Sequence, residues 1–121
     1  MNSRVRNHLI FLAKKGDSPI PYRRLINQTE LGLNLDIKHE KQLLGEILDE
    51  VSEEEYAENR PLLSALVQDK RNGQGDRFFK LCERLEMGDW KELKNDEEFR
   101  EREIQKCYEF WQNDENYSKF F

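Results

Sequence analysis

Two apolar runs separated by a polar loop that contains glycine constrain the fold of this chain more than any other feature. The runs cover residues 62–67 and 78–79, and the loop between them holds Gly73 and Gly75. Glycine supplies the positive φ that a tight reversal needs, and β-branched or aromatic side chains suit pleated strands. The segment 60–79 therefore predicts a β-hairpin.

Helical periodicity accounts for most of the remaining chain. Apolar residues recur every three or four positions before and after the expected hairpin, as they do in helices that bury one face. Gly16 is placed to end the first helix, Pro21 to begin the second and Asp36 to cap the third. We therefore predict helices over residues 7–15, 22–29, 37–56, 80–87 and 96–113.

The order of these elements predicts the fold class. Three helices, a hairpin and further helix form the succession of a winged-helix domain, although no clear segment corresponds to the first strand of many winged helices. We predict an α+β, mainly α fold with a winged-helix-like three-helix core over about residues 5–80. The hairpin is its wing, and a C-terminal helical extension covers about residues 81–121. A length of 121 residues suits a single domain, 1–121.

Composition limits the classes of protein to consider. Charged residues make up 37% and hydrophobic residues 36%, which indicates a small core under a densely charged surface. No apolar run approaches the roughly 20 residues of a membrane span, and the stretch 9–13 is too short for a signal core. Two cysteines, Cys82 and Cys107, do not make a disulfide framework and are typical of a reducing compartment. We expect a cytoplasmic protein without membrane association.

Four short segments carry a resemblance. They are Ile-Pro-Tyr-Arg-Arg-Leu at 20–25, Leu-Gly-Glu-Ile-Leu at 44–48, Arg-Pro-Leu-Leu-Ser-Ala-Leu-Val at 60–67 and Phe-Phe at 78–79. This succession resembles a small bacterial domain family of unassigned function. It is also similar to the DNA-binding half of the O6-alkylguanine alkyltransferase and alkyltransferase-like proteins, over about residues 19–80. That resemblance implies a winged-helix fold that docks on DNA.

The chain departs from the alkyltransferase pattern at the reactive segment. Pro-Leu-Leu-Ser at 61–64 stands where that family has Pro-Cys-His-Arg, so alkyl transfer is not implied. Arg23 stands where the family has the glycine of its Pro-Tyr-Gly helix. The resemblance therefore supports a fold more than an activity.

Basic residues suggest where a polyanion would bind. Residues 1–28 hold six Lys and Arg against one Asp, so they carry +5 while the rest of the chain carries −10. In a winged helix, the start of the third helix, the preceding helix and the wing converge on the DNA backbone. We expect double-stranded DNA as the partner, with a log–log salt slope of about −5. The expected contacts are Arg23, Arg24, Lys38, Lys41, Lys70, Arg71 and Arg77.

An acidic run supports an alternative function. Glu50, Glu53, Glu54, Glu55 and Glu58 lie toward the end of the third helix. They form either a solvated helix end or a surface that binds a basic protein, as in an immunity or antitoxin protein that inhibits its partner. The first hypothesis is thus a nucleic-acid-binding or assembly module, and the second an acidic inhibitor of a protein.

Recognisable catalytic patterns do not occur. His8 and His39 have no zinc-site spacing to each other or to cysteine, and no histidine is placed by sequence to activate Cys82. Gly73 and Gly75 are not followed by the Lys-Ser/Thr of a phosphate-binding loop. We therefore expect a non-catalytic protein with no cofactor and no metal.

Overall fold

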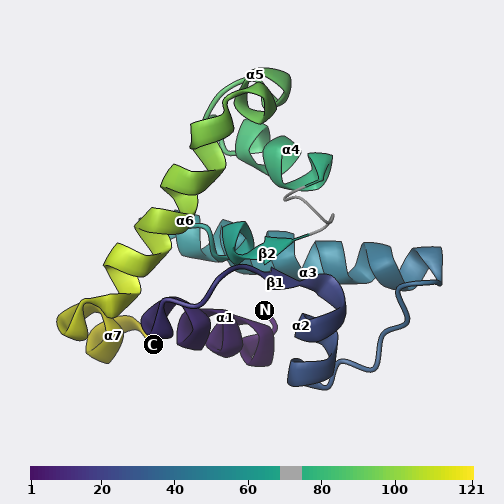
Figure 1. Cartoon of the computed structure of the whole chain (residues 1–121), viewed down its shortest axis with the longest axis horizontal. Coiled ribbons are helices and arrows are strands. Elements are labelled where there is room, and N and C mark those ends of the chain that lie inside the picture. The colour runs from purple at the N-terminus through teal and green to yellow at the C-terminus, as the bar shows by residue number, and fades with distance from the viewer. Residues whose placement is uncertain (69–74) are drawn as a thin grey trace.

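The structure is a computed structural model of the chain, and it describes residues 1–68 and 75–121. Helices dominate it, joined by one short 3-10 helix (η1) and two short strands (Figure 1). The elements, in chain order, are α1 (Ser3–Lys15), β1 (Ile20–Pro21), α2 (Tyr22–Thr29), α3 (Lys38–Ala57), η1 (Leu63–Leu66), β2 (Val67–Gln68), α4 (Asp76–Arg84), α5 (Trp90–Asn95), α6 (Glu97–Gln112) and α7 (Asp114–Phe120).

The long helix α3 crosses the middle of the molecule (Figure 1). Helices α1 and α2 lie on one side of it, α4 and α5 lie on the other, and α6 runs along one flank down to α7. The strands β1 and β2 pair in parallel near the centre, with Ile20 opposite Val67 and Pro21 opposite Gln68. The described residues therefore confirm an α+β fold that is mainly α. None of their helices combines the length and the apolar character needed to cross a bilayer.

The predicted β-hairpin is wrong. Residues 63–66 form the 3-10 helix, and Phe78 and Phe79 lie inside α4 rather than in a second strand. Phe78, Phe79, Leu81 and Cys82 are all buried, so helical spacing places this apolar run on the core. The partner of β2 is β1, far earlier in the chain, and a search for local strand pairs cannot find it.

Helix boundaries agree with the sequence where a cap or stop is local. The predicted helix 22–29 is α2, and Gly16 ends α1 with a φ of 74°. The side chain of Asp96 accepts a hydrogen bond from the Glu98 amide and caps α6.

Other boundaries were predicted wrongly. The helix α1 starts at Ser3, because Asn2 caps it by accepting from the Val5 amide. Pro21 lies in β1 and at the N-cap of α2, not in its first turn. Ile37 rather than Asp36 precedes α3, since the Asp36 amide is bound to the Asn34 side chain in a turn. The helix expected at 80–87 is α4, which begins at Asp76.

One hydrophobic core joins the two ends of the chain. Leu9 and Ile10 from α1 belong to the same buried cluster as Cys107 and Trp111 from α6. Helix α6 packs against both α1 and η1, so it is part of the body of the fold. The last helix, α7, folds back beside it: the Phe120 ring stacks on Phe110 at 5.9 Å between centroids.

Candidate functional site

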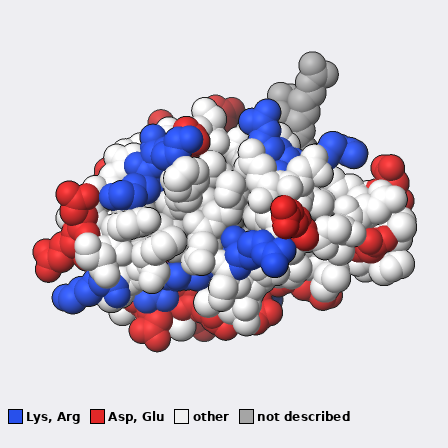
Figure 2. All heavy atoms as spheres, turned by 90° about the horizontal axis from the view of Figure 1, so that it is seen from below, with Lys and Arg blue, Asp and Glu red and all other residues white. Residues whose placement is uncertain are grey.

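Four of the predicted DNA contacts are exposed at the surface. Arg23 and Arg24 lie on α2, and Lys38 and Lys41 lie at the start of α3. Within residues 1–68 and 75–121, no ion pair involves Arg23, Arg24 or Lys38. In Figure 2, which shows one face of the molecule, Lys and Arg form separate groups divided by uncharged surface rather than a continuous track.

Of the three contacts predicted on the wing, the structure describes Arg77 alone. Lys70, Arg71 and Gly73 lie outside the described residues. Arg77 lies on α4 and donates from Nε to Oδ2 of Asp49, 3.2 Å away. Its placement in a wing was therefore wrong, because its helix packs against α3 and Asp49 offers it an internal partner.

The glutamates of the predicted acidic patch do not form one continuous surface, because three of them are engaged in ion pairs within the protein. Glu55 has no exposed surface and binds both Arg6 and Arg60, so its assignment to a binding surface was wrong. Glu50 lies 2.9 Å from the N-terminal amine, and Glu53 lies 3.3 Å from Arg84. Glu54 and Glu58 stay exposed. Glu55 is drawn inward because its helical position faces α1, which supplies an arginine.

The buried carboxylate organises a cluster at the end of α3, which we call the Glu55 cluster (Arg6, Glu55, Arg60, Trp111 and Phe120). Arg6 also donates to the Phe120 carbonyl at 2.7 Å, and its guanidinium lies 5.7 Å from the centre of the Trp111 ring. The Arg60 guanidinium lies 5.6 Å from the Phe120 ring. These contacts hold α1, α3 and the C-terminal helices together.

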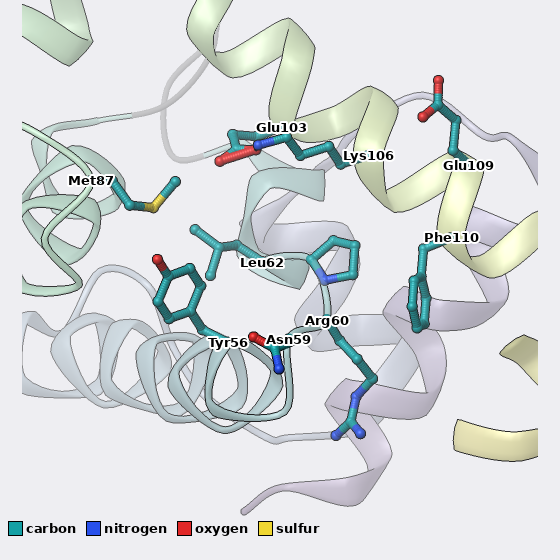
Figure 3. A pocket seen from close by; sticks show the side chains of 10 residues that line it. Tyr56, Asn59, Arg60, Leu62, Met87, Glu103, Lys106, Glu109 and Phe110 are labelled. Atoms are coloured by element: carbon teal, nitrogen blue, oxygen red, sulfur yellow. The ribbon is translucent and has the colours of Figure 1, made fainter.

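A groove next to this cluster has a volume of about 620 Å³. It lies between the end of α3, the segment 59–62, Met87 and α6 (Figure 3). Tyr56, Leu62 and Met87 converge at one end, and Phe110 lies at the other end beside Arg60. Its lining consists of Tyr56, Asn59, Arg60, Pro61, Leu62, Met87, Glu103, Lys106, Glu109 and Phe110.

The charges around the groove do not cancel. Lys106 is 2.9 Å from the buried Glu103, and Arg60 is bound to Glu55. Glu109 is exposed at the outer edge and belongs to no ion pair among the described residues (Figure 3). Two more exposed carboxylates, Glu58 and Glu86, directly precede the lining residues Asn59 and Met87 in the chain. Lys106 is therefore paired with Glu103 and Arg60 shares Glu55 with Arg6, while Glu109, Glu58 and Glu86 have no cationic partner among the described residues.

The thiols near the groove are unsuited to nucleophilic chemistry. Burial and the neighbouring Glu103 raise the pKa of Cys82 to about 12. The same two causes raise the pKa of Cys107, whose Sγ–H donates to the Leu62 carbonyl. A thiolate is the reactive form of cysteine, and these surroundings disfavour it. Across the described residues, no group of three or more His, Cys, Asp or Glu side chains is arranged to hold a metal ion.

Sequence reasoning did not find the groove. Tyr56, Met87 and Phe110 belong to three helices or turns that are distant in the chain, and no local spacing connects them. One sequence signal could have indicated this surface. Phe110 is a large apolar residue next to Trp111, which lies on the buried face of α6, so the Phe110 ring is directed away from that face. Comparison with protein-family models, curated proteins and solved structures found no match for this chain.

Proposed function

We propose that this protein is a non-catalytic assembly module that binds a protein partner in the groove between α3 and α6. The observation that carries the proposal is the groove itself, a hollow of about 620 Å³ between helices whose lining combines apolar side chains with charged ones. The side chains that dominate a protein interface commonly fill pockets on the partner, and a hollow of this kind can receive one. The thiols of Cys82 and Cys107 are buried, and no group of three or more His, Cys, Asp or Glu among the described residues is arranged to hold a metal ion.

The lining favours a protein segment as occupant. Tyr56 is 40% exposed although it stands beside the fully buried Glu55. Tyrosine and methionine are enriched in protein interfaces, where a ring or thioether buries apolar area and adapts to the partner. The Glu55 cluster fixes one wall, since Arg60 is held by Glu55 and by the Phe120 ring. A groove with a fixed wall loses little conformational entropy on binding.

Site-specific photo-crosslinking tests this function. A photoreactive amino acid at position 56, in the cells that produce the protein, should give a discrete adduct that mass spectrometry identifies as one protein. The matched control is position 43 on the same helix, where Leu43 is 45% exposed but lies outside the groove. The purified partner should then bind the wild type and lose affinity for Tyr56→Ala. Identical adducts from both positions, or undiminished binding by Tyr56→Ala, would overturn the proposal.

Nucleic-acid binding is a second candidate, favoured by one observation. Arg23, Arg24 and Lys38 are exposed and belong to no ion pair within the described residues. This candidate uses α2 and the start of α3, and it does not depend on a wing. Anisotropy of a labelled random duplex should rise on addition of protein, and the affinity should fall steeply with salt. Arg23→Glu with Arg24→Glu should abolish that binding, and no binding at low salt would exclude the candidate.

A further inference from the structure

We infer that the groove between α3 and α6 takes a short amphipathic segment whose apolar side chains are flanked by Lys and Arg. The inference rests on the proposed function and specifies the chemistry of the partner. It combines two observations: an apolar floor made by Tyr56, Leu62 and Met87, and a rim on which the uncompensated charges are negative.

The floor selects the apolar part of the segment. Leu62 is almost fully buried at the bottom, while Tyr56 and Met87 keep exposed surface on which another side chain can pack. Packing an apolar side chain of the segment on this floor removes apolar surface from water, which favours the complex. Helical segments present such side chains at spacings of three, four and seven residues, which suits a groove that runs between helices.

The rim selects the charged part. Both cations of the lining have a carboxylate partner: Lys106 binds Glu103, and Arg60 binds Glu55, which it shares with Arg6. Glu109 lies on the lining, and Glu58 directly precedes the lining residue Asn59 in the chain. Neither carboxylate has a cationic partner among residues 1–68 and 75–121. A basic flank would therefore meet uncompensated negative charge, whereas an acidic flank would be repelled. The rings of Tyr56 and Phe110 add faces that attract a cation.

Two labelled peptides of about four helical turns test this charge assignment. Both carry Leu and Phe on one face of the helix. All the remaining positions are Lys in one peptide and Glu in the other. Fluorescence anisotropy at about 50 and 150 mM salt should show the Lys peptide binding at least ~10-fold tighter than the Glu peptide, with the difference shrinking as salt rises.

Variants of the protein place the peptide in the groove. Tyr56→Ala should weaken the Lys peptide by about tenfold, and Leu43→Ala should not change it. The double variant Glu58→Lys, Glu109→Lys should remove the preference for the Lys peptide. Its matched control is Glu97→Lys with Glu101→Lys, two exposed carboxylates on α6 of which Glu97 lies roughly 18 Å from Glu109 along the helix. The control should keep the preference.

The outcomes separate the inference from the function on which it rests. Equal affinity for the two peptides, still lost in Tyr56→Ala, would overturn the charge assignment and leave the groove as a protein-binding site. A Lys-peptide affinity that both double variants reduce equally would show attraction to net charge alone and overturn the inference. A protein dimer in sedimentation that Tyr56→Ala dissociates would also overturn it, because a second copy would then occupy the groove.

Discussion

Two carboxylates on α3, Glu55 and Asp49, each bind two arginines, and their surroundings differ sharply. Glu55 is fully buried and joins Arg6 of α1 to Arg60 in the segment that follows α3. Asp49 keeps 13% of its side chain exposed and binds Arg77 and Arg84, both on α4 and both partly exposed. The same pairing of one carboxylate with two arginines therefore lies in the core at Glu55 and links α4 to α3 near the surface at Asp49.

The comparison explains why counts of charge misplace a binding surface. Glu55 was expected on an acidic surface and Arg77 on a basic wing, yet each is bound to an internal partner. An ion pair that forms inside the fold removes both of its charges from the surface available to a ligand. What remains for a partner is the set of charges without such a pair, which among the described residues includes Glu58, Glu86 and Glu109 near the groove and Arg23, Arg24 and Lys38 elsewhere.

The largest effect is expected from Glu55→Ala. The substitution leaves Arg6 buried without a carboxylate, and breaking a buried pair from one side costs about 3–5 kcal/mol. Urea denaturation should show this loss as a lower midpoint with an unchanged slope. Glu54→Ala, at the exposed neighbouring position, should change the free energy of unfolding by less than about 0.5 kcal/mol. A loss below about 1 kcal/mol at position 55 would contradict a structural role for the cluster.

Asp49→Asn should have a much smaller effect, within about 1 kcal/mol at pH 7, because its ion pairs are partly solvated. Desolvation by burial raises the pKa of Asp49 above its ordinary value of 3.8, against the opposing effect of Arg77 and Arg84. The carboxyl group of Asp49 therefore binds a proton more tightly in the folded state than in the unfolded state. The stability that this group contributes is present below pH 3.8 and is lost as pH rises through the raised pKa.

Denaturation at several pH values checks the sign for Asp49. The advantage of the wild type over Asp49→Asn should decrease as the pH is raised from about 3.5 to 7. An advantage that grows with pH would mean that the arginines, rather than burial, dominate the pKa of this carboxyl.

The smallest effect is expected from Gly45→Ala. A Cβ at position 45 would lie 2.5 Å from Nε of Arg77, so this flexible side chain must move away from Asp49. The lost ion pair opposes the gain in helix propensity of about 1 kcal/mol, and the net change should stay within about 1 kcal/mol. In the Asp49→Asn background the same substitution should be more stabilising. A double-mutant cycle without that coupling would show that Arg77 does not depend on Asp49.

Much of the helical framework was predictable because its signals are local. The helix α2 was predicted at its observed bounds, and α6 within one residue, from apolar periodicity. The hairpin failed because an apolar run of 78–79 fits a strand or a buried helix equally well without knowledge of its neighbours. The helices α5 and α7, of six and seven residues, gave no periodic signal long enough to recognise.

The candidate site was much less predictable. Of the seven residues expected to contact DNA, the structure shows four exposed and pairs Arg77 internally, while Lys70 and Arg71 lie outside the described residues. The groove was not predicted, because the surfaces of Tyr56, Met87 and Phe110 meet only after α3 and α6 have each packed against α1 and η1.

The sequence by itself determined a mainly helical α+β chain, the start and end of several helices, and an excess of carboxylates in its later part. These properties depend on residues a few positions apart, whose spacing is fixed by the geometry of one helix or turn. Only the tertiary structure decided that β1 pairs with β2, that Glu55 lies between two arginines, and which charges stay available beside the groove. Those outcomes depend on contacts between residues far apart in the chain, and burial then sets whether a charge is bound internally or remains at the surface.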